Sequence, residues 1–426
     1  MATEPIAAAS TAPPRATRKL IGFDWPAQLT LAERRSLVAG GLGWMLDAMD
    51  VMLLSMVLPY VMRELGIRAD RGGLLGLLTL GSSAVGGALF GFIADRIGRT
   101  RALMASILVY SLASGACGFS TTFWELAVFR IILGLGMGGE WTTGAALIAE
   151  TWPAEHRGKA LGLMQSTWAI GEMIAAGLTF LVLPRFGWRA VFFAGVLPAL
   201  LCFWIRRGVP ESHLWLTRGK KQQEGSLRLL WRQDIRWPGL LATVMNAFSM
   251  FAYWGLFYWI ATYLSNPISQ GGRGLNIAKT TVWLIVMGVG KWFGYTLFGF
   301  VADVLGRRKT YATYLLLAAV LVAAYGLTTN PAWLLTLGPL VAFFGTGYFS
   351  GYGAIASELF PTAIRATAMG LSYNIGRGLS ALAPFAVGAL AIHYGLGRAF
   401  FLPAAAFFVA ALLALALPET KGKQLD

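Results

Sequence analysis

The chain has 426 residues, of which 56 % are hydrophobic and only 13 % are charged, and its mean hydropathy is +0.61. These values exclude an ordinary soluble protein and favour a chain that lies mostly in lipid. The formal net charge of +15 would indicate a nucleic-acid partner in a soluble protein, so the positions of the basic residues decide what that charge means.

Twelve stretches are apolar and long enough to cross a bilayer, since a helix needs about 20 mostly apolar residues to span about 30 Å of hydrocarbon. The predicted spans are 36–62, 73–94, 102–119, 123–149, 159–183, 188–205, 239–264, 280–302, 310–328, 332–357, 366–393 and 399–417. We therefore expect an all-α membrane protein.

The second half of the chain repeats the first at a fixed distance of 208 residues. The segment GFIADRIGRTR (91–101) returns as GFVADVLGRRK (299–309), and AETWPAEHRGKALG (149–162) returns as ASELFPTAIRATAMG (356–370). VPES, which begins at Val209, returns as LPET. A fixed period of this kind indicates two copies of one structural unit.

The repeat predicts two six-helix bundles with pseudo-symmetry and a set of domain boundaries. The expected parts are a flexible tail (1–34), the first bundle (35–206), a central loop (207–237), the second bundle (238–418) and a short tail (419–426). The first tail is rich in Ala, Thr and Pro and lacks the apolar core of a signal peptide.

The distribution of the basic residues indicates how the chain is oriented in the membrane. If the termini, the repeated turns and the central loop lie on one side, that side holds 24 Lys and Arg residues and the other side holds 8. This asymmetry is the positive-inside pattern, so we expect a multi-pass protein of a bacterial inner membrane with both termini in the cytoplasm. The charge then needs no nucleic-acid partner.

The repeated turns are candidates for gates. Gly91 is expected to let two helix backbones approach, and Asp95 to cap a neighbouring helix or pair with Arg99. The alternative is that these charges only set topology. The candidate gating residues are Gly91, Asp95, Arg99, Glu150, Arg157, Gly299, Asp303, Arg307, Glu358 and Arg365.

GxxxDRxGR at 91–99, its second copy at 299–307, RxxxGxGxG at 130–138 and the PES and PET motifs together resemble the major facilitator superfamily. GWMLDAMD (43–50) is similar to the first helix of proton-coupled carboxylate symporters, and PETKG (418–422) to sugar porters. The resemblance implies alternating access, with helices 1, 4, 7 and 10 lining the cavity. Two departures, Thr100 after Arg99 and Val304 after Asp303, bear on the gates.

Ionisable side chains inside spans are expensive to bury and are therefore functional candidates. Asp47 and Asp50 share one helix face, where repulsion and loss of water both favour a bound proton. They are predicted proton carriers, with Asp50 weakly preferred, unless a neighbouring cation neutralises them. The resemblance implies a coupling role for Arg130, acting through Glu140, although a fixed pair is the alternative.

Glu172 in the fifth span is a further coupling candidate, or otherwise a helix-packing group. Arg377 is the predicted carboxylate anchor, because Arg grips a carboxylate with two hydrogen bonds. Asn374 and Tyr373 are expected on the same face. Lys291 is a second anchor or the partner of Asp50.

The seventh span has no charge but contributes Asn246, Tyr253 and Trp254 as an expected pocket wall, with an aromatic belt at the membrane surface as the alternative. The sequence thus predicts a secondary transporter that carries a small organic anion, an aliphatic or aromatic monocarboxylate, with protons. A sugar or other neutral-solute symporter is the alternative. We expect a monomer in the bilayer with no metal or cofactor beyond protons. Three His and two Cys residues are scattered and no nucleotide loop is present, so no enzyme is indicated.

Overall fold

The computed structural model describes residues 29–152, 154–211, 216, 232–360 and 365–420, and this part of the chain is helical with no strand. The helices of the first half are α1 (Leu31–Glu64), α2 (Ala69–Ile97), α3 (Arg99–Cys117), α4 (Phe123–Thr151), α5 (Ala154–Ala194), the short 3-10 helix η2 (Leu197–Leu200) and α6 (Leu201–Gly208). Helix α5 bends at Gly187, so it contains the fifth span and the start of the sixth.

The second half mirrors this arrangement. Its helices are α8 (Gln233–Phe257), α9 (Ile260–Ser265), η4 (Ile268–Gln270), α10 (Ile277–Leu305), α11 (Arg307–Leu327), α12 (Pro331–Leu359), α13 (Arg365–Ser380), α14 (Leu382–Ala399) and α15 (Phe401–Ala416). Helices α8 and α9 form the seventh span, and α13 with most of α14 forms the eleventh. The bend at Gly395 begins the twelfth.

The prediction of twelve spans is confirmed. Ten described segments are long and apolar enough to cross a membrane, and one of them, Lys159–Ile205, holds two spans divided at Gly187. Phe401–Ala416 completes the set as a shorter apolar helix.

The backbone itself carries the repeat. Among the described residues seven glycines have a positive φ angle, and six of them form three pairs separated by 208 residues, namely Gly66 with Gly274, Gly98 with Gly306, and Gly187 with Gly395. Residues with a Cβ rarely adopt this conformation, so glycine is required at each of these turns. The same turn thus redirects the chain at the same place in each copy.

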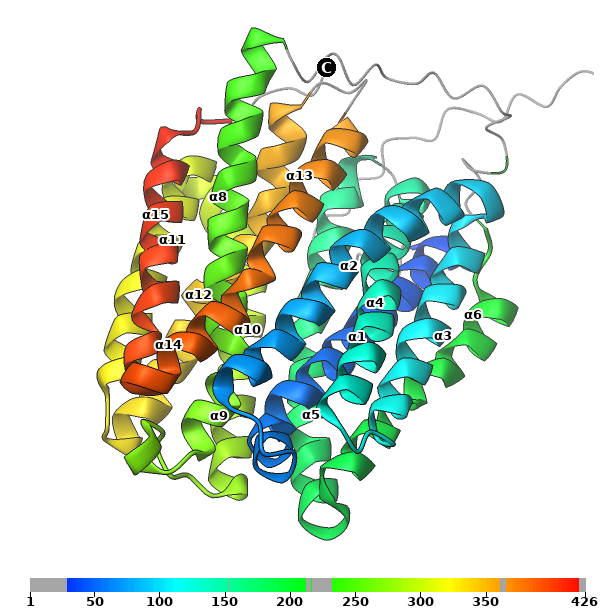
Figure 1. The fold of residues 1–426 in the computed structure, drawn as a ribbon. Helices are drawn as coiled ribbons and strands as arrows, with labels where there is room; N and C mark the ends of the chain where they lie inside the picture. Colours follow the sequence, from blue (N-terminus) through cyan, green and yellow to red (C-terminus); the bar gives the residue numbers. More distant parts are fainter. Residues whose placement is uncertain (1–28, 153, 212–215, 217–231, 361–364, 421–426) are drawn as a thin grey trace, which may run out of the picture.

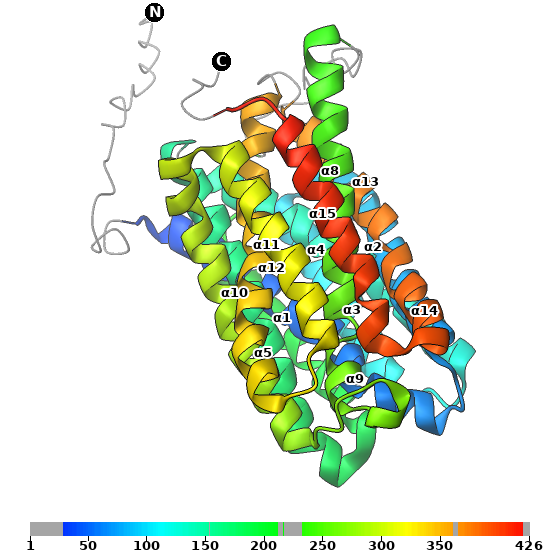
Figure 2. The same cartoon turned by 90° about the vertical axis from the view of Figure 1, so that its left-hand side faces the viewer.

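The two halves form two bundles that meet along α2 with α13 and α14, and along α5 with α10 (Figure 1). We call the side where α8 begins and α15 ends the termini side, which is at the top of Figure 1, and the opposite side the far side. Toward the termini side α2 and α13 spread apart. Figure 2 shows the same two bundles viewed from the side on which α10, α11 and α12 lie.

The bundles are closed on the far side by direct contacts. The Tyr258 hydroxyl donates to the Gly72 carbonyl at 2.7 Å, and Ser55 donates to the Tyr258 carbonyl at 2.6 Å. At Gly73 a Cβ would lie 2.3 Å from the Pro384 carbonyl oxygen, so only glycine permits this approach of α2 to α14. The two bundles are therefore packed together on the far side and spread apart toward the termini side (Figure 1).

Candidate functional site

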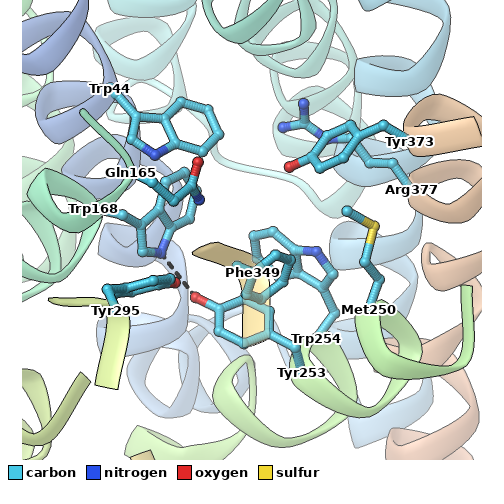
Figure 3. Close-up of a pocket in the computed structure, with 10 residues that line it drawn as sticks. All are labelled: Trp44, Gln165, Trp168, Met250, Tyr253, Trp254, Tyr295, Phe349, Tyr373 and Arg377. Atoms are coloured by element: carbon cyan, nitrogen blue, oxygen red, sulfur yellow. Dashed lines mark hydrogen bonds between the residues drawn. The ribbon is translucent and has the colours of Figure 1, made fainter. Parts of the chain in front are cut away.

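A pocket lies between the bundles (Figure 3). Its walls come from α1, α5, α8, α10, α12 and α13, so both bundles contribute. The lining residues are Trp44, Gln165, Trp168, Met250, Tyr253, Trp254, Tyr295, Phe349, Tyr373 and Arg377. Seven of these ten side chains are aromatic, and only Arg377 is charged. A ligand of this pocket would be held mainly by ring faces and by one cation.

Arg377 is in place to bind an anion. The residue is only 3 % exposed, and no described group accepts a hydrogen bond from its guanidinium or forms an ion pair with it. Figure 3 shows the guanidinium beside the Tyr373 ring at the edge of the pocket. Buried charges are normally paired, so an unpaired cation against a pocket indicates a missing anionic partner.

Tyr373 also covers the pocket. Its ring stacks on Trp141 of α4, with centroids 4.1 Å apart and planes 6° apart. The stack joins the two bundles at the middle of α13, in the part of the span Ala368–Ala399 that is nearer the termini side. The pocket is thus closed on the far side by packed backbones and on the termini side by two side chains.

Two predicted pocket residues lie elsewhere. The Asn374 amide group donates to the Gly370 carbonyl at 3.0 Å, and its oxygen faces α2, where a Cβ on Gly87 would lie 2.8 Å from it. Asn246 packs against Gly376 within the second bundle. Asn374 is therefore not among the residues that line the pocket in this structure, although Tyr373 and Arg377 are. Tyr253 and Trp254 line the pocket as expected.

The buried carboxylates occupy different surroundings. Asp47 and Glu140 are fully buried, and no described group donates a hydrogen bond to their carboxylate oxygens. The charged groups that act on Asp47 are Arg377 and Arg130. Asp50 instead lies against Ser114 and Gly195, inside the first bundle. Asp47 is therefore the carboxylate of the pair that faces the pocket cation, which does not support the weak preference for Asp50.

Arg130 has a neutral partner. Its Nε donates to the Thr79 hydroxyl of α2 at 3.0 Å, and no ion pair joins it to Glu140. The two residues lie ten positions apart on α4, which is about 15 Å along a helix. The alternative of a fixed Arg130–Glu140 pair is thus excluded in this structure.

Glu172 is the centre of a polar cluster that joins the bundles. Its Oε2 pairs with Lys291 Nζ of α10 at 2.5 Å. Its Oε1 accepts from Trp168 Nε1 at 2.7 Å and from the Tyr253 hydroxyl at 2.8 Å. Lys291 also lies over the Phe257 ring, 3.5 Å from the centroid. The alternative that paired Lys291 with Asp50 is corrected, because its partner is Glu172.

The predicted gates include two matching ion pairs on the termini side. Arg99 pairs with Glu150 at 3.1 Å, and Arg307 pairs with Glu358 at 3.5 Å. The backbone amide of Arg99 also donates to the Glu211 carboxylate at 2.8 Å. Glu419 accepts from the Arg307 amide in the same way at 2.9 Å. The Glu of the PES motif thus caps the start of α3, and the Glu of the PET motif caps the start of α11.

The expected role of Gly91 as a point of close backbone approach is wrong in this structure. A Cβ on Gly91, or on Gly299 in the second copy, would meet nothing within 4 Å. Both lie near the ends of α2 and α10 on the termini side, where the bundles have separated. The side chains of the candidates Asp95, Asp303, Arg157 and Arg365 lie outside the described residues.

Sequence reasoning from charge missed the uncharged part of the site. Gln165 and Trp168 precede Glu172 by seven and four residues, so helical spacing from a buried carboxylate could have found them. Met250 precedes Tyr253 by three residues on α8 in the same way. No comparable signal marked Phe349 or the Trp141 stack, because these depend on how two helices meet.

Comparison with known proteins agrees with this geometry. The family model described as Major Facilitator Superfamily matches residues 41–289, and the one described as Sugar (and other) transporter matches residues 217–426. A probable 4-methylmuconolactone transporter of Cupriavidus pinatubonensis is 32 % identical, covering 95 % of each chain. The cis,cis-muconate transport protein of Acinetobacter baylyi is also 32 % identical, covering 90 % of this chain and 94 % of the relative.

Among solved structures, the crystal structure of a D-xylose-proton symporter has the same fold, with a TM-score of 0.74 at 22 % identity. The match covers 92 % of this chain and all of that one. Family models, relatives and fold agree with the twelve-helix architecture and its internal repeat. The chain therefore belongs to the major facilitator superfamily and is a membrane transporter rather than an enzyme.

Proposed function

We propose that the protein is a secondary active transporter that carries a small organic anion together with protons by alternating access. The observation that carries this proposal is the Arg377 guanidinium, which is buried at the pocket without a protein partner among the described residues. A carboxylate matches the guanidinium with two parallel hydrogen bonds. The substrate would supply the missing charge.

The aromatic walls favour an apolar or conjugated body attached to that carboxylate. Trp44, Trp168 and Trp254 surround the space next to Arg377, and ring faces bind flat apolar groups well. The relatives named as muconate and methylmuconolactone transporters support this substrate class. An aromatic or unsaturated carboxylate fits these features.

A sugar or other neutral solute is the second candidate. The D-xylose-proton symporter supports it only through the shared fold. A sugar needs many polar partners, whereas this pocket offers one amide, Gln165, beside three Tyr hydroxyls and Arg377. The balance of ring faces and a free cation favours the anion.

Proton coupling would run through the same cation. In the empty protein Arg377 is one of the two cations that act on the buried Asp47 carboxyl group. A substrate carboxylate on Arg377 would offset that charge, so Asp47 would take up a proton as the anion binds. Substrate and proton would then bind together, and the loaded carrier would reorient without a buried net charge.

The separated ends on the termini side would face the cytoplasm, in agreement with the basic residues placed there. The protein would thus lie in a plasma membrane of the bacterial inner type. The Trp141–Tyr373 stack would then lie between the pocket and the cytoplasm.

Ligand-dependent thermal stabilisation of the purified protein tests the substrate class, because a ligand that binds only the folded state raises its apparent stability. We expect benzoate or cis,cis-muconate to raise the melting temperature and xylose to have no effect. Arg377→Gln should abolish the shift. Stabilisation by xylose alone would overturn the proposal. Uptake of the acid into proteoliposomes tests the coupling. Equal uptake with and without a pH gradient would refute the proposal that protons are carried with the acid.

A further inference from the structure

A second cavity lies on the far side of the Glu172 cluster. It receives side chains from both bundles, from α1 and α5 in the first and from α9 and α10 in the second. Its lining residues are Met56, Tyr60, Ala176, Thr179, Leu183, Ala261, Ser265, Ile277, Thr280, Thr281 and Leu284. None of them lines the substrate pocket. We call this space the outer cavity.

One face of α5 connects the two cavities. Gln165 and Trp168 line the substrate pocket, and Glu172 follows Trp168 by one helical turn. Ala176 and Thr179 continue the same face at spacings of four and three residues, and both line the outer cavity. Glu172 is therefore placed between the pocket and the outer cavity.

Helix α10, like α5, lines both cavities and places its ion-pair residue between them. Tyr295 lines the substrate pocket, Lys291 lies four residues before it, and Leu284 and Thr281 line the outer cavity. Between them Gly288 lies so close to α5 that a Cβ would be 2.3 Å from Met173. The ion pair and this tight contact together close the space between the cavities.

The pair is distinctive among the four ion pairs formed between described residues. Three of them join helices of one bundle, and only Glu172–Lys291 joins the two bundles. In alternating access the bundles rock against each other around the site. A buried pair with one partner on each side must therefore be broken when α5 separates from α10.

The structure shows what each partner would keep after the pair breaks. Glu172 would retain hydrogen bonds to Trp168 and Tyr253, which its neutral acid form can also accept. Lys291 would retain only the Phe257 and Tyr253 rings, 3.5 and 5.1 Å from Nζ, and these do not neutralise a buried cation. Lys291 therefore needs a second anion.

We propose that the Glu172–Lys291 pair is the barrier between the two cavities, and that a proton on Glu172 and a substrate carboxylate on Lys291 replace it together in each transport cycle. The charges balance, since one anion and one cation become a neutral acid and a new anion–cation pair. This rests on the proposed function, because it needs an anionic substrate. It assigns the substrate a second charged contact, reached after Arg377.

The other groups around Glu172 do not take this role. Tyr253 from α8 and Tyr295 from α10 are the remaining titratable groups near it, and both are neutral at physiological pH. From α12, Phe349 contributes only a ring. The charges on the other helices packed against α5 act elsewhere, since Asp47 and Glu140 both interact with Arg377.

The test uses Glu172→Gln, which mimics the protonated acid, in purified protein and in proteoliposomes. Two transport measurements are compared, namely exchange of labelled for unlabelled benzoate without a gradient, and accumulation of benzoate driven by a pH gradient. We expect the variant to keep exchange and to lose accumulation. The matched control is Glu64→Gln, because Glu64 also pairs with an Arg and a Trp indole but within one bundle. It should keep both activities.

The double variant Glu172→Gln with Lys291→Met tests whether Lys291 binds the substrate carboxylate. It leaves neither Glu172 nor Lys291 as a buried charge without a partner. It should bind benzoate about tenfold more weakly than Glu172→Gln alone, the loss of one charge-assisted hydrogen bond. Equal affinity of the two variants would overturn the proposal. So would gradient-driven accumulation by Glu172→Gln, or a folded Glu172→Gln protein that loses exchange as well.

Wild type and Arg377→Gln are measured beside these variants, so that two failures can be told apart. If wild type binds no carboxylate, or if Arg377→Gln binds it equally well, the proposed function fails. If that binding depends on Arg377 while Glu172→Gln still accumulates benzoate, only the barrier assignment fails.

Discussion

Replacing Arg377 and replacing Lys291 should have different consequences, although both are buried cations of the second bundle. Arg377 has no described partner, and Lys291 holds Glu172 at 2.5 Å. Breaking a buried pair by removing one partner costs about 3–5 kcal/mol, because a charge is left uncompensated. Lys291→Gln should therefore lower the melting temperature of the empty protein, toward the smaller end because Trp168 and Tyr253 still donate to Glu172.

Arg377→Gln removes a charge that has no hydrogen-bonded or ion-paired partner among the described residues, so the empty protein should lose less stability than it does in Lys291→Gln. Its effect should appear on the ligand. Losing one partner of a desolvated, hydrogen-bonded charge pair costs about 2–5 kcal/mol, which is about 30-fold or more in the dissociation constant of a carboxylate. The corresponding neutral amide should bind wild type and variant with similar, weak affinity.

The measurements are the melting temperatures of the three empty proteins and the calorimetric affinities of benzoate and benzamide. Arg377→Lys is a useful control, because it keeps the charge and loses the two-pronged geometry. The reasoning is refuted if Arg377→Gln destabilises the empty protein as much as Lys291→Gln does. It is also refuted if the affinity for benzoate is unchanged in Arg377→Gln.

Three further outcomes follow from the structure. Gly98→Ala should lower the free energy of unfolding by about 1–3 kcal/mol, because φ is +105° and the new Cβ would lie 2.2 Å from the Glu211 carboxylate. Gly91→Ala should leave the stability unchanged, because its Cβ would meet nothing within 4 Å. Equal effects of the two variants in thermal unfolding would contradict this reasoning. Glu211→Gln should cost about 1 kcal/mol through the weaker cap on α3, and an unchanged melting temperature would show that the cap is not needed. Tyr373→Phe should keep the Trp141 stack and the release rate of bound substrate, while Tyr373→Ala should speed release; equal rates in stopped-flow measurements would remove the stack as a gate.

The fold could be predicted from the sequence because the patterns that indicate it are local or periodic. Apolar runs of membrane length predict spans wherever they occur, and the period of 208 residues needs no contact to be seen. The structure places glycine turns such as Gly98 and Gly306 at this same period. The candidate cation Arg377 was also found from the sequence, because an ionisable residue in an apolar span is conspicuous.

The partners of the charges were decided only by the tertiary structure. Glu172 and Lys291 lie 119 residues apart, on helices of different bundles, and the repeat relates neither to the other, since Ser380 and Ser83 occupy the equivalent positions. Whether Asp47 or Asp50 faces Arg377 likewise depends on the rotation of α1 against its neighbours, and both residues satisfy the same pattern. Spacing along one helix determines which residues share a face, but the contact between two helices is set by packing over their whole length.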